Sequence, residues 1–276
     1  MHIQKKLLHL CIVTLMYTTS KAQPSITAVI GSIIDQKVDA IVNAANPHLS
    51  AGGGVCGAIF EAAGKSDLEA KCALFTWDQP DGLPVGDAIA TDSCNLKSKG
   101  IQYIIHAIGP DGRIIKDQDE QRTLLQCAYL NSLQLAEQRG VKSIAFPFIS
   151  SGIYNVDPEL AAQAAVDAIK SYVKGHPTHI KEIRFALWGP TKETDFELFQ
   201  NILAGKTKQK EQSKEDFNLD SKKESKEAPK KKSIETSSGV ALWKKLLITV
   251  GVGATGYLVY KYRTKSKDQT GSQAAL

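Results

Sequence analysis

The stretch that decides the fold runs from residue 40 to residue 63 and reads AIVNAANPHLSAGGGVCGAIFEAA. Ala40–Asn43 is a short apolar run typical of a buried strand, and Val55–Ala63 is predicted to be a helix opened by glycines. The three glycines at 52–54 let backbone N–H groups approach an anion with no Cβ in the way. The start of the following helix adds its dipole. This order predicts an anion-binding loop in an α/β protein.

Strands and helices alternate through the rest of residues 25–204, which we interpret as one domain. Further strands are predicted at Ile26–Ile30, Ala88–Ser93, Tyr103–Ile108, Ser143–Pro147 and Glu182–Trp188, and helices at Glu120–Arg139, Pro158–Val173 and Thr191–Leu203. This alternation is typical of an α/β layered sheet. No internal repeat is visible.

A second loop of small residues, FISSGIY at 148–154, follows the strand Ser143–Pro147. Ligands of α/β sheets bind beyond the carboxyl ends of the strands, so both loops belong to the expected ligand edge. Neither loop carries Lys, which excludes a Walker loop. Either loop alone could be a tight turn that packs small residues. Together they favour a clamp that meets a diphosphate with backbone N–H dipoles.

The charge distribution separates the domain from its ends. The chain has a net charge of +5, but residues 25–204 hold 15 basic and 21 acidic residues, a net charge of −6. An acidic domain lacks the positive surface that nucleic-acid binding requires, so we expect no nucleic-acid partner. The spacing of the five cysteines matches no zinc or disulfide framework, so no metal site is expected, and all of them except Cys56, which lies in the glycine-rich loop, are interpreted as buried, inert thiols.

Residues 1–23 have the order of a secretory signal peptide. Lys5 and Lys6 precede an apolar run at 7–17, and small residues at 20 and 22 predict cleavage after Ala22. A mitochondrial presequence or a buried helix are the alternatives.

Residues 205–276 predict a linker, a membrane helix and a tail. Residues 205–241 are rich in Lys, Glu and Ser and are expected to be a charged, disordered linker. Residues 242–262 contain an uncharged run at 246–260 between basic and aromatic residues, which predicts one membrane-spanning helix. Residues 263–276 form a basic tail. The protein is thus expected to be a single-pass membrane protein, and basic residues on both sides of the helix leave its orientation open. The GxGxxG pattern at 251–256 lacks the following helix and strand of a dinucleotide site.

Several separated blocks resemble the macrodomain family, including its MacroD-type and viral members. They are residues 31–64, PVGDAIATDSCNL at 84–96, YIIHAIGP at 103–110, residues 124–154 and NVDPELAAQAA at 155–165. The resemblance covers about two-thirds of the chain. It implies a three-layer α/β/α sandwich with a mixed central sheet, ADP-ribose or an ADP-ribosylated protein as partner, and no cofactor.

The resemblance also implies roles for individual residues. Asn46 resembles the residue that contacts the distal ribose, Tyr154 would pack against that ribose, and Trp188 would cap adenine unless it packs in the core. The expected catalytic residues are Asn46 and Cys56, and the expected ligand-binding residues are Ser32, Ile33, Ala44, Asn46, Gly53, Gly54, Val55, Ser150, Ser151, Gly152, Ile153, Tyr154 and Trp188.

Two positions depart from the commonest family pattern. Ser32 stands where an Asp usually accepts from the adenine amino group, and a hydroxyl accepts more weakly than a carboxylate. Cys56 stands where MacroD-type hydrolases carry an Asp. The macrodomains of alphaviruses have a Cys at this position, as this chain does. His48 is interpreted as a solvated loop histidine. In the family's proposed chemistry, water positioned by the substrate's own phosphate attacks the anomeric carbon, so the protein mainly supplies geometry.

Three functions follow from this resemblance. The first is hydrolysis of mono-ADP-ribosyl groups from proteins. The alternatives are a non-catalytic, membrane-tethered reader of ADP-ribose and an O-acetyl-ADP-ribose deacetylase. Asn46 and the two glycine-containing loops favour an enzyme, whereas Ser32 and Cys56 favour a reader.

Overall fold

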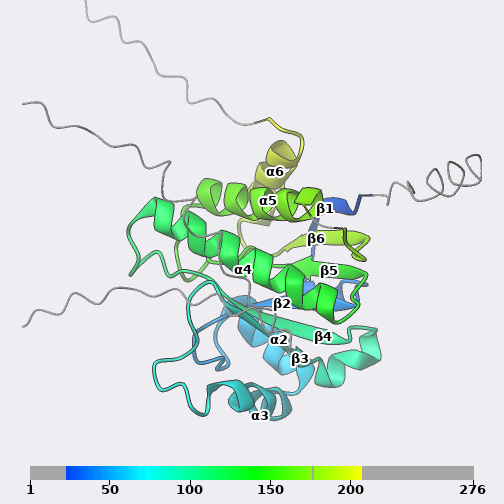
Figure 1. The fold of residues 1–276 in the computed structure, drawn as a ribbon, viewed down its shortest axis with the longest axis vertical. Coiled ribbons are helices and arrows are strands. Elements are labelled where there is room, and N and C mark those ends of the chain that lie inside the picture. Colours follow the sequence, from blue (N-terminus) through cyan, green and yellow to red (C-terminus); the bar gives the residue numbers. More distant parts are fainter. Residues whose placement is uncertain (1–22, 176, 207–276) are drawn as a thin grey trace, which may run out of the picture. The chain divides into compact units, whose positions relative to one another are not determined.

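A computed structural model describes residues 23–175 and 177–206. Six strands form one sheet in the order β1-β6-β5-β2-β4-β3 (Figure 1). They are β1 (Ser25–Ile30), β2 (Ala40–Ala45), β3 (Ala88–Asp92), β4 (Tyr103–Ile108), β5 (Ser143–Phe146) and β6 (Glu182–Leu187). All neighbouring strands are parallel except β3 and β4. The sheet is therefore mixed, as predicted.

Helices cover both faces of this sheet (Figure 1). They are α2 (Gly54–Ala63), α3 (Lys65–Thr76), α4 (Gln118–Gln138), α5 (Pro158–Gly175) and α6 (Lys192–Leu203), with short 3-10 turns η1 (Ile33–Asp35) and η2 (Cys94–Lys99). Buried residues of α4, α5 and α6 share one apolar cluster, and those of α2 and α3 share the other. The α/β/α sandwich is thus confirmed.

The central strands are buried on both faces, as parallel strands between helices usually are. Val42 and Ile105 lie in the cluster that contains α4 and α5, whereas their neighbours Ile41 and Ile104 lie in the cluster that contains α2 and α3. All four side chains are fully buried. Because the core holds the strands rigidly, the loops after their carboxyl ends start from fixed positions.

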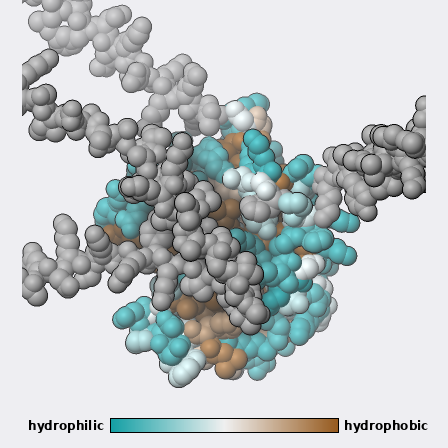
Figure 2. Space-filling model, viewed as in Figure 1, coloured by the Kyte–Doolittle hydropathy of each residue, from teal (hydrophilic) through white to brown (hydrophobic). Residues whose placement is uncertain are grey.

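The sequence did not predict α3, whose apolar pattern is weak. Only Leu68 and Cys72 of this helix are buried, whereas Leu74 and Trp77 at its end are 73% and 81% exposed. Figure 2 shows a mainly hydrophilic face with an apolar area at its lower end, where Figure 1 places α3. The other predicted elements are present, with ends shifted by one or two residues.

Several predictions concern residues outside the described part of the chain. The predicted signal peptide at 1–23 lies there except for Gln23, as do most of the linker at 205–241, the membrane helix at 242–262 and the tail at 263–276. Within 23–175 and 177–206, no helix is long and apolar enough to cross a bilayer.

Candidate functional site

A pocket of about 640 Å³ lies at the carboxyl edge of the sheet. Its lining comes from the residues that follow β2, β4, β5 and β6, so it extends across neighbouring strands of the sheet. The lining residues are Ala44–Asn46, Gly52–Cys56, Gly109, Pro147–Tyr154, Pro158, Ala186–Thr191 and Asp195. The residues after β2 and β4 form one end and the loop after β6 forms the other, because β5 lies between β2 and β6.

The loop after β2 brings the start of α2 to the pocket. Gly53 caps this helix without a side-chain hydrogen bond, and Gly54 has φ 61, a left-handed conformation that favours glycine. In the described part of the chain, the N–H groups of Gly52–Cys56 donate to no protein acceptor. Unpaired N–H groups at a helix start attract anions.

The loop after β5 presents a second set of unpaired donors. Within the described residues, the N–H groups of Ser150–Tyr154 likewise donate to no protein acceptor. Ser150 is 6% exposed and has φ 64, and its Oγ is buried without a hydrogen-bond partner among these residues. A buried hydroxyl without a partner is costly unless a ligand or water completes its hydrogen bond. The two loops therefore form a pocket suited to an anion, although its lining contains no Lys or Arg.

The side chain of Asn46 organises the loop that follows it. Its Oδ1 accepts from His48 N at 3.1 Å, Ser50 N at 3.2 Å and Ser50 Oγ at 3.1 Å, while its Nδ2 donates to Ser50 O at 2.8 Å. An amide nitrogen has two N–H donors, so one remains for a ligand. Asn46 can thus donate to a ligand hydroxyl, but its oxygen is already occupied. The backbone and hydroxyl contacts show that it also shapes the loop.

Cys56 lies in the first turn of α2 and is 5% exposed. Its Sγ donates to Ser50 O at 3.7 Å and accepts from Asn43 Nδ2 at 3.6 Å. No carboxylate or imidazole among the described residues makes a hydrogen bond to this thiol. The arrangement lacks the adjacent base that activates a cysteine nucleophile.

The loop after β6 forms the other end of the pocket. Trp188 lines it and is 67% exposed, which excludes the alternative that this ring packs in the core. Ile153, also on the lining, is 62% exposed. Exposed apolar side chains on a pocket lining are suited to the flat face of a ligand ring.

Comparisons with known proteins agree with this geometry. A sequence model of the macro domain family matches residues 42–165. A macro domain-containing protein from Caldanaerobacter subterraneus is 42% identical over 169 residues, which cover 61% of this chain and 90% of that protein. This chain belongs to the macrodomain family. A protein named O-acetyl-ADP-ribose deacetylase from an Enterobacter species is 39% identical over 181 residues, covering 66% of this chain and 94% of the relative.

Solved macrodomain structures have the same fold. A mutant macrodomain from Oceanobacillus iheyensis with ADPR matches with a TM-score of 0.59 and 31% identity, covering 66% of this chain and 94% of that one. A Trypanosoma brucei macrodomain in complex with ADP-ribose matches with a TM-score of 0.55 and 29% identity, covering 64% and 68% of the two chains.

Most residues that the sequence singled out lie together in this macrodomain's pocket. Ala44, Asn46, Gly53–Cys56, Ser150–Tyr154 and Trp188 all line it. Tyr154 lies under the guanidinium of Arg113, whose Cζ is 5.7 Å from the ring centroid, and burial raises the pKa of the Tyr154 hydroxyl. Their roles toward a ligand stay predictions.

Ser32 and Ile33 are not among the pocket-lining residues. Ile33 is 3% exposed and packs in the cluster that contains Ile41, which gives it a core position. The carbonyl oxygen of Ser32 accepts from Gln36 Nε2 at 3.0 Å, an interaction that holds the turn η1. The structure therefore does not bring these two side chains into the lining.

Gly109 and Asp195 are among the lining residues that the sequence did not single out. Gly109 directly follows β4, and Asp195 lies in the first turn of α6. The position of Gly109 after a strand was a usable signal, because ligand loops follow the carboxyl ends of strands. Asp195 gave no such signal, because it lies within a helical pattern.

A buried polar group of the macrodomain lies close to the lining residue Cys56. His106 on β4 is fully buried, and burial lowers its pKa to about 3, so the ring is neutral. Its Nδ1 contacts Asn43 Nδ2 at 3.2 Å, and its Nε2 contacts Thr91 Oγ1 at 3.1 Å. Because Asn43 Nδ2 can only donate, Nδ1 accepts and the ring proton lies on Nε2. Asn43 thus links this histidine to Cys56.

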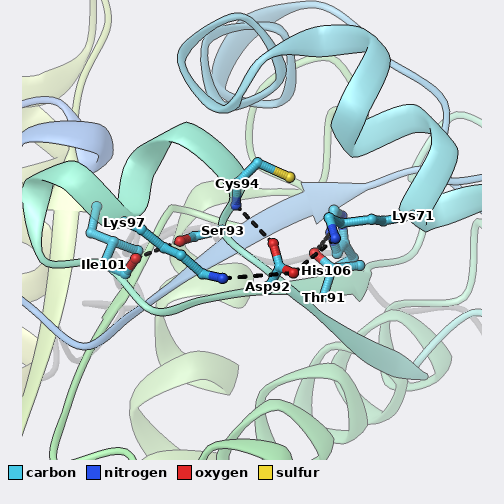
Figure 3. Close-up of polar contacts among 8 residues, drawn as sticks. All are labelled: Lys71, Thr91, Asp92, Ser93, Cys94, Lys97, Ile101 and His106. Carbon is cyan, nitrogen blue, oxygen red and sulfur yellow. Dashed lines mark hydrogen bonds and ion pairs between the residues drawn. The ribbon is translucent and has the colours of Figure 1, made fainter.

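Figure 3 shows that His106 and Thr91 lie beside a partly exposed ion cluster at the end of β3. Asp92 pairs with Lys71 at 2.8 Å and Lys97 at 3.8 Å, and it accepts from Cys94 N at 3.0 Å. The hydrogen bond from Lys71, followed by that from Cys94 N, lowers the pKa of Asp92 to about 2. None of these ion-pair residues lines the pocket, so we assign the cluster to the connection between α3, β3 and η2.

Proposed function

We propose that this macrodomain binds ADP-ribose in the pocket and hydrolyses the bond between its distal ribose and a protein side chain. One observation carries the proposal: two loops with unpaired N–H groups, Gly52–Cys56 and Ser150–Tyr154, line one pocket that has no basic side chain. Such a pocket suits a diphosphate whose charge is met by backbone dipoles. Solved macrodomains with ADPR or ADP-ribose support the choice of ligand.

The order of the strands supports one orientation of ADP-ribose in the pocket. The distal ribose lies at the β2 end, where Asn46 has one amide N–H available. The diphosphate lies between the two loops, and adenine lies on Trp188 at the β6 end. Neighbouring strands are about 4.8 Å apart, so β2 and β6 are separated by about 10 Å across β5.

The chemistry assigned to the protein is mainly positioning. At the β2 end the described lining residues include no carboxylate, and the thiol of Cys56 already contacts Ser50 O and Asn43 Nδ2. The water is therefore positioned by the substrate's diphosphate and attacks the anomeric carbon. The bond to the side-chain oxygen breaks, a proton of the water passes to the phosphate, and ADP-ribose and the free carboxylate leave. Holding the reactants in this geometry lowers the barrier.

Deacetylation of O-acetyl-ADP-ribose is the second candidate function. Relatives that are 39% to 44% identical to this chain carry the name O-acetyl-ADP-ribose deacetylase. That reaction also breaks an ester at the distal ribose, so it uses the same pocket and orientation. A reader without catalysis is the third possibility, and it requires only binding.

One assay separates these three functions. The protein is incubated with a protein that is mono-ADP-ribosylated on acidic side chains and, separately, with O-acetyl-ADP-ribose. Release of ADP-ribose from the modified protein is the expected result. Release of acetate alone favours the deacetylase, and binding without release of either product favours the reader.

We also propose where the macrodomain is located, on the basis of the membrane helix that the sequence predicts at 242–262. It would tether the domain to a membrane through the linker at 205–241. Fractionation tests the tether: the full chain should stay with membranes in alkaline carbonate, and a chain ending at residue 241 should not. Equal release of both chains would contradict it.

A further inference from the structure

Asp195 is the only residue on the described pocket lining whose side chain is ordinarily charged at neutral pH. It lies in the first turn of α6, at the end of the pocket that follows β6. A pocket suited to a diphosphate should exclude carboxylates, because like charges repel. Asp195 therefore suits a hydrogen-bond donor on the ligand, away from the diphosphate.

The contacts of Asp195 leave one carboxylate oxygen available. Its Oδ2 accepts from Thr191 Oγ1 at 2.9 Å, which fixes the side chain against the start of α6. Its Oδ1 accepts from no described residue. The neighbouring Lys192 pairs with Glu193 at 3.1 Å, so this lysine does not neutralise Asp195. Burial raises the pKa of Asp195, which indicates that the carboxylate is partly desolvated.

Trp188 lies on the same end of the pocket, and its ring is largely exposed. A nucleobase that stacks on this ring presents its edge to the other lining residues of that end. Adenine has an exocyclic 6-amino group that donates, whereas hypoxanthine and guanine have a 6-oxo group that accepts. A carboxylate therefore favours adenine and repels the 6-oxo bases, and a charged acceptor does so more strongly than a hydroxyl.

We propose that Asp195 selects adenine by accepting a hydrogen bond from the 6-amino group of a base stacked on Trp188. The assignment rests on the proposed binding of ADP-ribose and adds a specificity-determining residue to it. It also accounts for Ser32, whose side chain is not on the pocket lining. Base selection by this macrodomain then comes from α6 and not from the turn η1.

The test compares the affinities of the full chain for ADP-ribose and for inosine diphosphate ribose, which differs only in its 6-oxo base. We expect the wild-type protein to prefer ADP-ribose at least about tenfold, the difference that one hydrogen bond to a charged group supplies. Asp195→Asn should lose most of this preference, because an amide can also donate to the 6-oxo group. Thr191 can still donate to the Asn side chain, so α6 should stay intact.

Two further variants serve as controls. Ser32→Ala should keep the wild-type preference, because that side chain is not on the lining. Trp188→Ala should weaken the binding of both nucleotides by a similar factor, because both bases stack on the Trp188 ring.

The outcomes separate this inference from the proposed function. If Asp195→Asn binds ADP-ribose and keeps the wild-type preference, or if Ser32→Ala loses it, the assignment is wrong. If Asp195→Asn weakened the binding of both nucleotides by a similar factor, the carboxylate would contact a ribose hydroxyl and not the base, and the assignment would also be wrong. If the wild-type protein binds neither nucleotide, the proposed function itself fails. If it binds both equally, only the selection by Asp195 fails.

Discussion

Gly109 and Ser150 approach so closely that a Cβ atom on Gly109 would overlap Ser150 Oγ and lie 2.5 Å from Ile149 Cγ2. Gly109 follows β4, and Ser150 lies in the loop that follows β5. The missing side chain lets this loop reach the end of a strand that is not its neighbour in the sheet. The contact thereby fixes the backbone donors of Ser150–Tyr154 at the pocket.

Gly109→Ala should therefore displace the loop after β5 and weaken ADP-ribose binding. We expect a cost of about 1–3 kcal/mol, the usual range for overpacking, shared between stability and binding. Thermal unfolding and calorimetric titration measure the two parts. Gly175→Ala is the matched control, because a Cβ there meets no atom within 4 Å. Unchanged affinity in Gly109→Ala would mean that the loop does not depend on this contact.

Asn46→Ala should reduce turnover strongly, because it removes three accepting contacts within the loop and the one available donor. A substrate misplaced by about 1 Å can lose about 100-fold in rate, and we expect a decrease of that size. Release of ADP-ribose from a modified protein measures it. Asn201→Ala, an exposed position on α6 outside the pocket lining, is the control. Turnover within about twofold of wild type would refute the role of Asn46.

Cys56→Ser should keep turnover within about tenfold of wild type, a difference of ~1.4 kcal/mol in activation free energy. A hydroxyl can still donate to Ser50 O and accept from Asn43, so the side chain at position 56 should keep its contacts. Cys127→Ser, at a half-buried position away from the lining, controls for loss of a thiol. A nucleophilic cysteine would instead lose several orders of magnitude in rate, and that result would contradict water attack positioned by the substrate.

His106 should make the domain less stable in mild acid. Its pKa is lowered by burial to about 3 in the folded state, against an ordinary value of 6.5. Between these pH values the unfolded chain binds a proton that the folded domain excludes, so stability falls as pH falls. The slope is about 1.4 kcal/mol per pH unit, or ~2 kcal/mol between pH 6.5 and pH 5.

Urea unfolding at a series of pH values measures this slope. His106→Gln, which cannot be protonated in this range, should have a shallower dependence even if it is less stable at pH 7. Equal slopes in the two proteins would show that the acid sensitivity comes from other groups.

The fold was largely predictable because its strands and helices carry strong local patterns. The apolar run in β2 and the long helix α4 up to Gly140 can be recognised without tertiary information. Helix α3 could not, since only Leu68 and Cys72 are buried and its other residues give no stripe. The antiparallel pairing of β3 with β4 depends on how the chain crosses the sheet, which local residue patterns do not specify.

The pocket-lining residues that directly follow strands could be predicted from the sequence. Asn46 and the loop Ser150–Tyr154 belong to this class, and both line the pocket. Gly109 and Asp195 depend on contacts between segments distant in sequence, so their importance emerges only in the structure. Ser32 and Ile33 were expected from the family resemblance, but neither side chain lies on the lining.

Calorimetric titration of the protein with ADP-ribose tests the central claim most directly. The claim is that the unpaired N–H groups of Gly52–Cys56 and Ser150–Tyr154 hold a diphosphate in one pocket. It predicts saturable binding with one site per chain, and weaker binding in Gly109→Ala but not in Gly175→Ala. Absence of binding at ~1 mM ADP-ribose, which corresponds to a binding free energy weaker than ~−4 kcal/mol, would contradict the account.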